Sequence, residues 1–337
     1  MKYKRTSVVL SILLAVAGCG TEAKTPKRPS EPRVVSFVHD IPQGHPRLPY
    51  FDDFAGTVDS RSRHEAVVRI NPQQQVLAGR ASLEAVLSGQ ANIAAVNMAH
   101  LEAIEPTTGF MNLPFGLDDT VMSDAATRDA IVGVLADQVR PHGIELLGLM
   151  RGADQLFAFP QNNIRQLEDL HGKRIRVAGG GLYEQLMRSL AAEPVPIPIP
   201  RLGAAMANGE VDGAFTSPGG WSTEIIGKAP HAVQVPGLMF INYAVVADAK
   251  WLAGLSAAEH TAVTEAGHNL TNRWTQMAGD DADLVSRMVS NRTGTYSIVP
   301  EAEVVRWRHR VADISARFLN DHPELATRLR QEGLFRR

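Results

Sequence analysis

The sequence predicts an α/β protein built from two similar lobes. A short phrase occurs twice, as Ser88–Ala94 and as Asn208–Ala214, and the two copies match position by position in chemical type. Each copy follows an amphipathic helix, contains a Gly suited to ending that helix, and leads into an apolar run that predicts a buried strand. Strands also alternate with helices along the chain, which is typical of mostly parallel sheets. Two lobes imply a cleft between them, although chance similarity of seven positions is the alternative.

The first residues predict an export signal. Residues 1–18 begin with basic side chains and continue with an apolar stretch, Ser7–Val16, that is too short to span a bilayer. Small residues precede Cys19, as in a bacterial lipobox, so Cys19 is expected to carry a lipid. An ordinary signal peptide cleaved nearby is the alternative.

Cys19 is the only cysteine of the chain, which excludes intramolecular disulfides and cysteine metal sites. Residues 19–33 are rich in Pro, Lys, Thr and Glu and predict a lipidated tether that holds the rest of the chain near a membrane. No later segment is long and apolar enough to cross a membrane. The net charge of -2 gives no indication of nucleic-acid binding.

The first half of the folded region alternates strands with helices. We expect strands at 33–38, 65–71 and 91–96, and helices at 49–60, 81–87 and 123–140. The second strand alternates polar and apolar residues, and Gly89 is the expected stop of the helix before the third. Residues 107–117 are expected to form a loop.

The second half continues this pattern and ends in long helices. We expect strands at 144–150, 155–159 and 173–177, a short helix at 164–170 and a helix that opens at the glycines 179–181. The prolines of 194–200 favour an edge strand. Apolar residues at helical spacing predict one long helix over 256–289, started by a Ser256–Glu259 capping box and weakened at Gly279. This helix is expected to brace both lobes.

Arg176 is the best candidate for ligand binding. In Lys173–Val177 the residues alternate, so Arg174 and Arg176 share a face, and Arg176 lies near the strand's carboxyl end, where open α/β sheets bind ligands. The glycines that follow it, with the next helix start, offer backbone N–H groups and a positive dipole. A guanidinium beside such donors suits a carboxylate. The alternative is that both arginines are ordinary surface residues.

The repeated phrase adds two more candidates. Asn97 and Ser217 stand five residues beyond Asn92 and Asp212, so equivalent units would bring both to strand ends that face one cleft. Simple strand capping is the alternative. No nucleophile elbow, zinc-protease motif or phosphate-binding loop is present, and the eleven histidines show no metal-ligand spacing. We therefore expect a protein that is not an enzyme and uses no cofactor or metal.

From about Val34 onward, five segments carry a family resemblance: Ala81–Ala94, Asn112–Phe115, Leu167–Val177, Gly209–Gly213 and Lys250–Leu252. They resemble the solute receptors of tripartite ATP-independent periplasmic (TRAP) transporters, of the dicarboxylate-receptor type. The resemblance implies the two-lobe periplasmic-binding-protein fold, α/β with mixed sheets, crossing strands and a long bracing helix. It also implies lobe I at 34–155 and 243–280 and lobe II at 156–242 and 281–337.

The resemblance also implies roles for single residues. Arg176 falls on the family's carboxylate-binding Arg, Arg151 best matches a second ligand-binding Arg, and Thr216 or Ser217 replaces a family Asn. Asn97 stands where sialic-acid receptors carry Glu, which argues against sialic acid. Three further residues occupy expected cleft positions: His39, Phe240 and Tyr243.

The expected function is that of a periplasmic, lipid-anchored receptor that binds a small organic acid and delivers it to the membrane permease subunits of a TRAP transporter. An extracytoplasmic enzyme or a sensory lipoprotein on the same scaffold is the alternative, because a fold does not fix a function. A receptor that has lost ligand binding and serves as an adaptor is a third hypothesis.

Overall fold

A computed structural model describes residues 31–71, 79–161 and 164–335 of the chain. The predicted signal peptide, Cys19 and nearly all of the predicted tether lie outside the described residues. Within the described residues, no helix combines the length and the apolar composition that crossing a bilayer requires.

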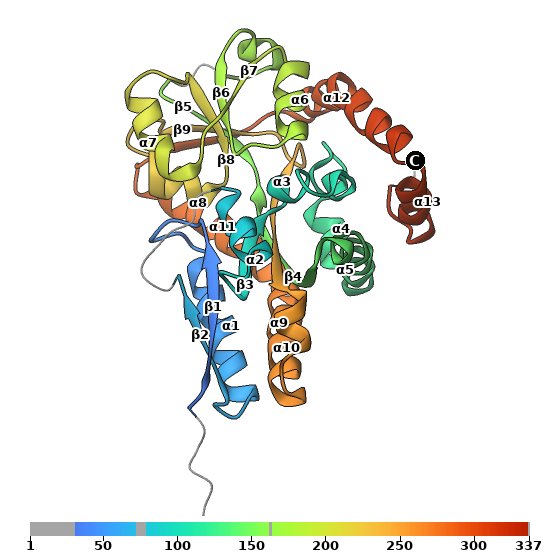
Figure 1. Ribbon diagram of the computed structural model, residues 1–337. Coiled ribbons are helices and arrows are strands. Elements are labelled where there is room, and N and C mark those ends of the chain that lie inside the picture. Colours follow the sequence, from blue (N-terminus) through green and yellow to red (C-terminus); the bar gives the residue numbers. More distant parts are fainter. Residues whose placement is uncertain (1–30, 72–78, 162–163, 336–337) are drawn as a thin grey trace, which may run out of the picture. The chain divides into compact units, whose positions relative to one another are not determined.

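The first sheet has five strands. Their order is β2 (Ala66–Ile70), β1 (Arg33–His39), β3 (Ile93–Asn97), β10 (Phe240–Asp248) and β4 (Ile144–Asp154) (Figure 1). The strands β1, β2 and β3 are parallel, whereas β10 runs antiparallel to both of its neighbours. The sheet is therefore mixed. The antiparallel strand β10, which lies between β3 and β4, comes from late in the chain.

The second sheet has six strands and is also mixed. Their order is β11 (Thr295–Ile298), β9 (His231–Gln234), β5 (Leu156–Phe159), β8 (Gly213–Thr216), β6 (Arg174–Val177) and β7 (Glu193–Pro196). The strand β5 runs antiparallel to β8 and β9, and the other pairs are parallel. Two mixed α/β sheets confirm the predicted fold class, and the Pro-rich β7 lies at an edge, as predicted.

One stretch of chain serves both sheets. The strand β4 ends at Asp154 and β5 begins at Leu156, so only Gln155 separates a strand of the first sheet from a strand of the second. Gln155 is buried, and its Nε2 donates to the Tyr183 hydroxyl at 3.1 Å. This passage confirms the predicted crossing of the chain between the sheets.

The repeated phrase forms equivalent units. The helices α2 (Ala81–Leu87) and α7 (Ile199–Ala207) end before Gly89 and Gly209, whose φ angles of 73° and 67° suit only glycine well. The residues Asn92 and Asp212 then play the same part in the two sheets. The side chain of Asn92 accepts from Ser36 N of β1 at 2.9 Å, and that of Asp212 accepts from Arg174 N of β6 at 2.8 Å. Each ties its own strand to the parallel neighbour, so the similarity of the two phrases reflects a shared structural unit.

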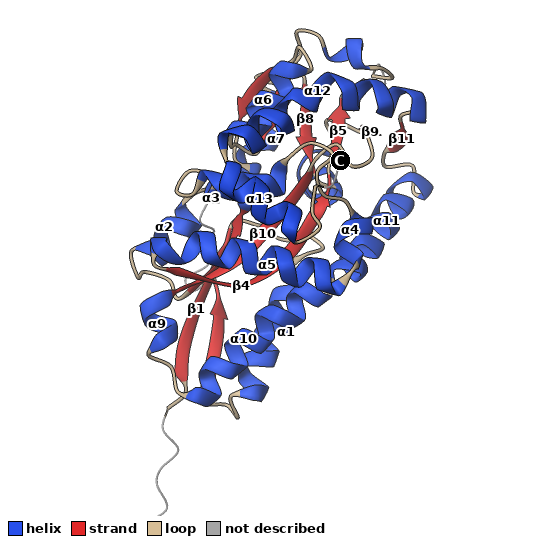
Figure 2. Ribbon diagram, turned by 90° about the vertical axis from the view of Figure 1, so that its right-hand side faces the viewer, coloured by secondary structure: helices blue, strands red, loops and turns tan. Residues whose placement is uncertain are grey.

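Helices cover both faces of each sheet. On the first sheet, α1 (Leu48–Arg61) and α10 (Ala257–Asn272) share an apolar cluster on one face, and α5 (Ala125–Val139) packs on the other (Figure 2). On the second, α7 lies on one face, and α6 (Gly181–Ser189) and α12 (Glu301–Asp321) lie on the other. The cluster beneath α5 continues to α6 and α12, so the two sheets share one apolar core.

The predicted long helix is two helices. The capping box of Ser256 and Glu259 starts α10 as expected, but α10 ends at Asn272 and α11 spans Trp274–Ser290. The break is at Arg273, which leaves helical geometry with ψ at 11°, and not at Gly279, which lies inside α11. The prediction of one helix with a weak point at Gly279 was therefore wrong about the position of the break.

The expected helix 123–140 is α5, and the short helix α4 (Asp119–Ser123) precedes it. The carboxylate of Asp124 accepts from Thr127 N at 2.8 Å and starts α5. Two other segments differ from the prediction. The segment 164–170 forms only a 3₁₀ turn at Leu167–Leu170, and 107–117 contains a 3₁₀ helix at Pro106–Asn112. The other short elements are α3 (Met98–Leu101), a 3₁₀ turn at Arg140–His142, α8 (Pro218–Gly220), a π-helical turn at Trp221–Ile225, α9 (Ala249–Ala253) and α13 (Pro323–Gln331).

Candidate functional site

A small cavity of about 30 Å³ lies where strand ends of the two sheets meet. The first sheet and its loops contribute Asp40, Pro42, His45, Gly79, Asn97, His100, Ile241 and Tyr243, and the second contributes Arg176, Ala178, Pro198, Ile199, Thr216 and Ser217. The carboxyl ends of β1, β3, β6 and β8 converge here, which is where open α/β sheets place their ligands.

Arg176 is buried in this cavity wall and has no acidic partner. The side chain is 3% exposed, its Nε donates to the carbonyl of Ile197 at 2.7 Å, and its Nη1 donates to the carbonyl of Phe215 at 3.4 Å. Among the described residues, no carboxylate oxygen lies within 4.0 Å of its guanidinium. Burial lowers the pKa of Arg176 to about 10, so the group stays protonated at neutral pH. A buried cation without a partner is costly, and an anion in the cavity would offset that cost.

Asp40 faces the same cavity and has an unpaired oxygen. It follows β1 directly, and its Oδ1 is shielded from solvent with no hydrogen-bond partner among the described residues. Burial raises the pKa of Asp40 to about 6, while a backbone N–H from Gly79 and the charge of Arg176 oppose that rise. Asp40 is therefore a hydrogen-bond acceptor that the described residues leave incompletely satisfied.

The two histidines of the cavity are neutral at pH 7. Burial lowers the pKa of His45 to about 3, and its Nδ1 accepts from Arg47 N at 3.2 Å. Burial, helped by the charge of Arg80, also lowers the pKa of His100. Arg176 is consequently the one cation among the residues that line the cavity.

Asn97 and Ser217 occupy matching positions, one at the end of β3 and one just beyond β8. The Oδ1 of Asn97 accepts from Ala99 N at 3.0 Å, and the Oγ of Ser217 accepts from Gly220 N at 2.9 Å. Both residues therefore cap the turn that follows their strand, and both line the cavity. The sequence left open whether Asn97 and Ser217 cap their strands or face a cleft. In the structure each side chain does both.

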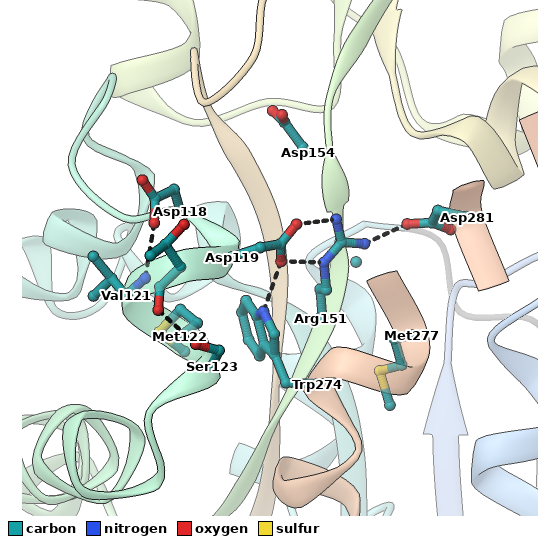
Figure 3. Close-up of polar contacts among 12 residues, drawn as sticks. Asp118, Asp119, Val121, Met122, Ser123, Arg151, Asp154, Trp274, Met277 and Asp281 are labelled. Atoms are coloured by element: carbon teal, nitrogen blue, oxygen red, sulfur yellow. Dashed lines mark hydrogen bonds and ion pairs between the residues drawn. The ribbon is translucent and has the colours of Figure 1, made fainter. Parts of the chain in front are cut away.

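Arg151 lies in a different set of contacts from the one that the sequence predicted. Its Nε and Nη2 donate to the two carboxylate oxygens of Asp119 at 2.7 and 2.8 Å, and its Nη1 forms an ion pair with Asp281 (Figure 3). The ring of Phe240, another predicted site residue, lies 5.4 Å from the Arg151 guanidinium carbon. Neither residue is among those that line the cavity of Arg176.

This ion-pair cluster holds the crossing strand. Arg47 is fully buried, pairs with Asp281 at 2.7 Å and donates to the carbonyls of Arg151 and Gly152, both at 2.8 Å. Asp281 is on α11, so the cluster joins the loop before α1, the end of β4 and α11. Two carboxylates already satisfy Arg151, which removes the physical reason for it to bind a ligand.

His39, also predicted in the site, belongs to the core beneath α1. Its Nδ1 accepts from Ile41 N at 3.1 Å, and its ring centroid lies 4.8 Å from that of Phe51. Burial lowers the pKa of His39 to about 4, so the side chain is neutral. Of the remaining predicted residues, Thr216 and Tyr243 do line the cavity.

The first turn of α6 does not supply the backbone N–H donors that the sequence predicted for the cavity, because it is bound by another side chain of the protein. The carboxylate of Glu102 receives the backbone N–H of Leu182 in the first turn of α6 and the side-chain amide of Asn112 at 2.5 Å. Gly180, with φ at 97°, allows Ala99 to approach, since a Cβ atom there would lie 2.8 Å from that of Ala99. An acidic side chain from the α3 region therefore occupies the positive end of α6.

Sequence reasoning missed Asp40, His45 and His100. Asp40 follows the carboxyl end of a parallel strand, which is the same signal that singled out Arg176. The approach of His45 and His100 depends on how loops pack, and no local pattern encodes that packing. Within the described ranges, no group of three or more His, Cys, Asp or Glu side chains is placed to hold a metal ion.

Comparison with known proteins places this geometry in context. The family model described as "Bacterial extracellular solute-binding protein, family 7" (DctP) matches residues 37–321. A curated C4-dicarboxylate-binding periplasmic protein from Rhodobacter capsulatus is 19% identical over 307 residues, which cover 90% of each chain.

Solved structures resemble the chain along most of its length. A sugar acid binding protein from Advenella mimigardefordensis in complex with galactonate has a TM-score of 0.81 at 19% identity, covering 90% of this chain and 98% of that one. A Bordetella pertussis extracytoplasmic solute receptor that binds pyroglutamic acid gives 0.78 at 17%, covering 88% and 99%. A TRAP periplasmic solute-binding protein from Pseudomonas aeruginosa with bound L-malate gives 0.77 at 16%, covering 85% and 100%. These likenesses show a shared fold.

Proposed function

The chain belongs to family 7 of the bacterial extracellular solute-binding proteins, and from that premise we propose that it is a TRAP receptor for a small organic acid. The observation that carries the proposal is Arg176, a buried guanidinium in a cavity between two sheets that forms no ion pair with any described residue. Similar structures hold galactonate, pyroglutamic acid and L-malate, each of which contains or forms a carboxylate. This supports a carboxylate as the group that Arg176 binds.

In the proposed mechanism the ligand carboxylate pairs with Arg176, and polar side chains from both sheets complete the contacts. These are Asn97, Thr216, Ser217 and Tyr243. A cavity of about 30 Å³ has room for about one water molecule, so the two halves must separate to admit an acid and then close around it. Closure removes water from the ion pair and strengthens it. Membrane permease subunits would then recognise the closed form.

The proposed location is the periplasm, with the chain held at a membrane through a lipid on Cys19. The support is the export signal and the lipobox-like residues before Cys19, together with membership of an extracellular family. Mass spectrometry of the mature N-terminus tests the anchor, and Cys19→Ala is expected to release the protein into the soluble periplasmic fraction. An unmodified N-terminus at a residue other than Cys19 would contradict the lipid anchor and support an ordinary signal peptide that is cleaved nearby.

Calorimetry against a panel of organic acids tests receptor function. We expect binding without turnover, and we expect Arg176→Ala to weaken it by about 100-fold or more, because a charge-assisted bidentate contact is lost. Arg188→Ala is the control, since Arg188 is exposed on α6 and pairs with Glu184. Formation of a product would favour an enzyme, and the absence of any thermal shift with every acid would favour an adaptor.

A further inference from the structure

We propose that the ligand is a monocarboxylate that also carries a hydrogen-bond donor, a hydroxyl or an ammonium group, and that Asp40 accepts this donor. The inference rests on the proposed function and narrows its ligand class. It depends on two residues that line one cavity. Among the described residues, the buried cation of Arg176 has no ion-pair partner within 4.0 Å, and a buried oxygen of Asp40 has no donor.

The charge of the cavity limits the number of carboxylates. Arg176 is the one cation among the lining residues, because the other basic side chains there, His45 and His100, are neutral at pH 7. The sequence suggested Arg151 as a second cation, but Asp119 and Asp281 already pair with it outside the cavity. The Asp40 carboxyl, with a pKa of about 6, already opposes the charge of Arg176 in this cavity, so one ligand carboxylate is the most that Arg176 can pair with.

Asp40 supplies the second requirement. An acceptor that is buried without a partner costs about 1–3 kcal/mol, and a donor on the ligand would remove that cost. The described residues offer no donor to Oδ1 of Asp40, although Asp40 lines the cavity. A ligand without a donor at this point would leave the oxygen unpaired, so the site discriminates against it.

Asp40 also excludes a second carboxylate. Two like charges in a small, poorly solvated cavity repel each other, and such repulsion is a common means of rejecting a near-related ligand. Dicarboxylates are therefore expected to bind less tightly than monocarboxylates that carry a donor.

The test is a calorimetric comparison of acids of equal chain length. The three-carbon set is propionate, lactate and alanine, and the six-carbon set is hexanoate and gluconate, with succinate as the dicarboxylate. We expect the donor-bearing acid of a set to bind the wild-type protein at least tenfold more tightly than the unsubstituted acid and succinate. Asp40→Ala is expected to abolish this preference, while the exposed control Asp129→Asn keeps it.

Asp40→Asn separates the two possible donors. The amide oxygen still accepts from a hydroxyl, so lactate or gluconate is expected to keep its affinity within threefold, whereas alanine is expected to lose tenfold or more because its ammonium loses a charge partner. Thermal unfolding shows whether each variant is folded.

The contrary outcomes are distinct. If an unsubstituted acid or succinate binds as tightly as a donor-bearing acid, or if Asp40→Ala keeps the preference, the role of Asp40 is wrong while Arg176-dependent binding still supports a receptor. If no acid binds, the receptor function and the role of Asp40 are both contradicted.

Discussion

At the scale of single residues, two carboxyl groups outside the cavity have unusual protonation. Burial raises the pKa of Glu102 and of Asp154 to about 7. The Oδ2 of Asp154 accepts from Gly237 N at 2.9 Å, but its Oδ1 has no partner among the described residues. Figure 3 shows Asp154 at the end of the crossing strand, without a line to the paired Arg151. Both groups therefore hold a proton at pH values where an exposed carboxyl is ionised.

Asp154 makes stability fall as pH rises. Its folded-state pKa is about 7 and its ordinary value is 3.8, so between these pH values the folded chain retains a proton that the unfolded chain has lost. Each pH unit in this window lowers the free energy of unfolding by up to about 1.4 kcal/mol. We expect Asp154→Asn to gain stability relative to the wild type from pH 5 to pH 7, with no further gain above pH 8.

Urea unfolding of wild type and variant at each pH measures this difference. The comparison must be made pairwise, because His39 and His45 have lowered pKa values and act in the opposite direction, losing stability as pH falls. The control Asp129→Asn should follow the wild-type curve. A constant difference between wild type and Asp154→Asn over the whole range contradicts the assignment.

Sequence rules predicted that Arg176 lies at the cavity but missed by one position at His39, and the binding role of each residue stays a prediction. Period-two alternation places Val35, Phe37 and His39 on one face of β1, and in the structure that face packs beneath α1. The next residue, Asp40, leaves the strand and reaches the cavity. Arg176 was found because alternation and the strand-end rule agree there.

At the scale of elements, β4 and α10 approach each other through glycines. A Cβ atom at Gly148 would lie 2.3 Å from the carbonyl oxygen of Gly267, and one at Gly267 would lie 2.2 Å from that of Leu147. Neither glycine has a positive φ, so close packing is the reason for both. This contact sets the distance between α10 and the strand that crosses to the second sheet.

Gly267→Ala is expected to destabilise the protein by about 1–3 kcal/mol or more, because the helix must move away from β4. Gly279→Ala is the matched control within the next helix. Apart from the backbone of its own helix, no described atom lies within 4 Å of a Cβ atom at Gly279, so alanine there should stabilise by about 0.5–1 kcal/mol. Urea unfolding measures both values, and equal effects from the two substitutions would count against the packing argument.

Gly279 also shows why the helix break was misplaced. A glycine inside a helix costs only about 1 kcal/mol relative to alanine, and the tertiary contacts of α11 outweigh that cost. The actual break, at Arg273, brings Trp274 into the core, where its Nε1 donates to Asp119 at 2.8 Å. That requirement comes from a partner more than a hundred residues away, so a local reading of the sequence does not contain it.

At the scale of the whole described region, the half built on the first sheet and the half built on the second sheet are in close contact at one glycine. Gly219 of α8 lies against His45, and a Cβ atom at Gly219 would be 2.3 Å from Nε2 of that ring. We expect Gly219→Ala to disfavour the closed arrangement, reducing ligand affinity about tenfold and increasing the radius of gyration with ligand present. Calorimetry and small-angle X-ray scattering measure these changes.

The control for this substitution is Gly227→Ala, where nothing lies within 4 Å of an added Cβ atom. Its affinity and scattering should match those of the wild type. Wild-type affinity in Gly219→Ala would mean that closure does not require contact between α8 and His45.

The two-lobe plan was predictable because each repeated phrase builds its unit from neighbouring residues. The lobe boundaries and the Cys19 anchor stay predictions. The order of strands within each sheet was not predictable in this way, because β10 lies between β3 and β4 and no local signal marks that insertion. Pairings between distant segments arise from the shared apolar core, whose members become neighbours only in the folded chain.

The position of β10 also determines when the first sheet can be completed during synthesis of the chain. Until residue 248 has left the ribosome, β4 has no partner in its own sheet, since β10 is the strand that pairs with it there. The nascent chain must therefore carry an unpaired strand through the translation of some ninety residues, and contacts of such long sequence separation slow folding. A polypeptide that completes its first sheet so late keeps that sheet unfinished for most of its synthesis.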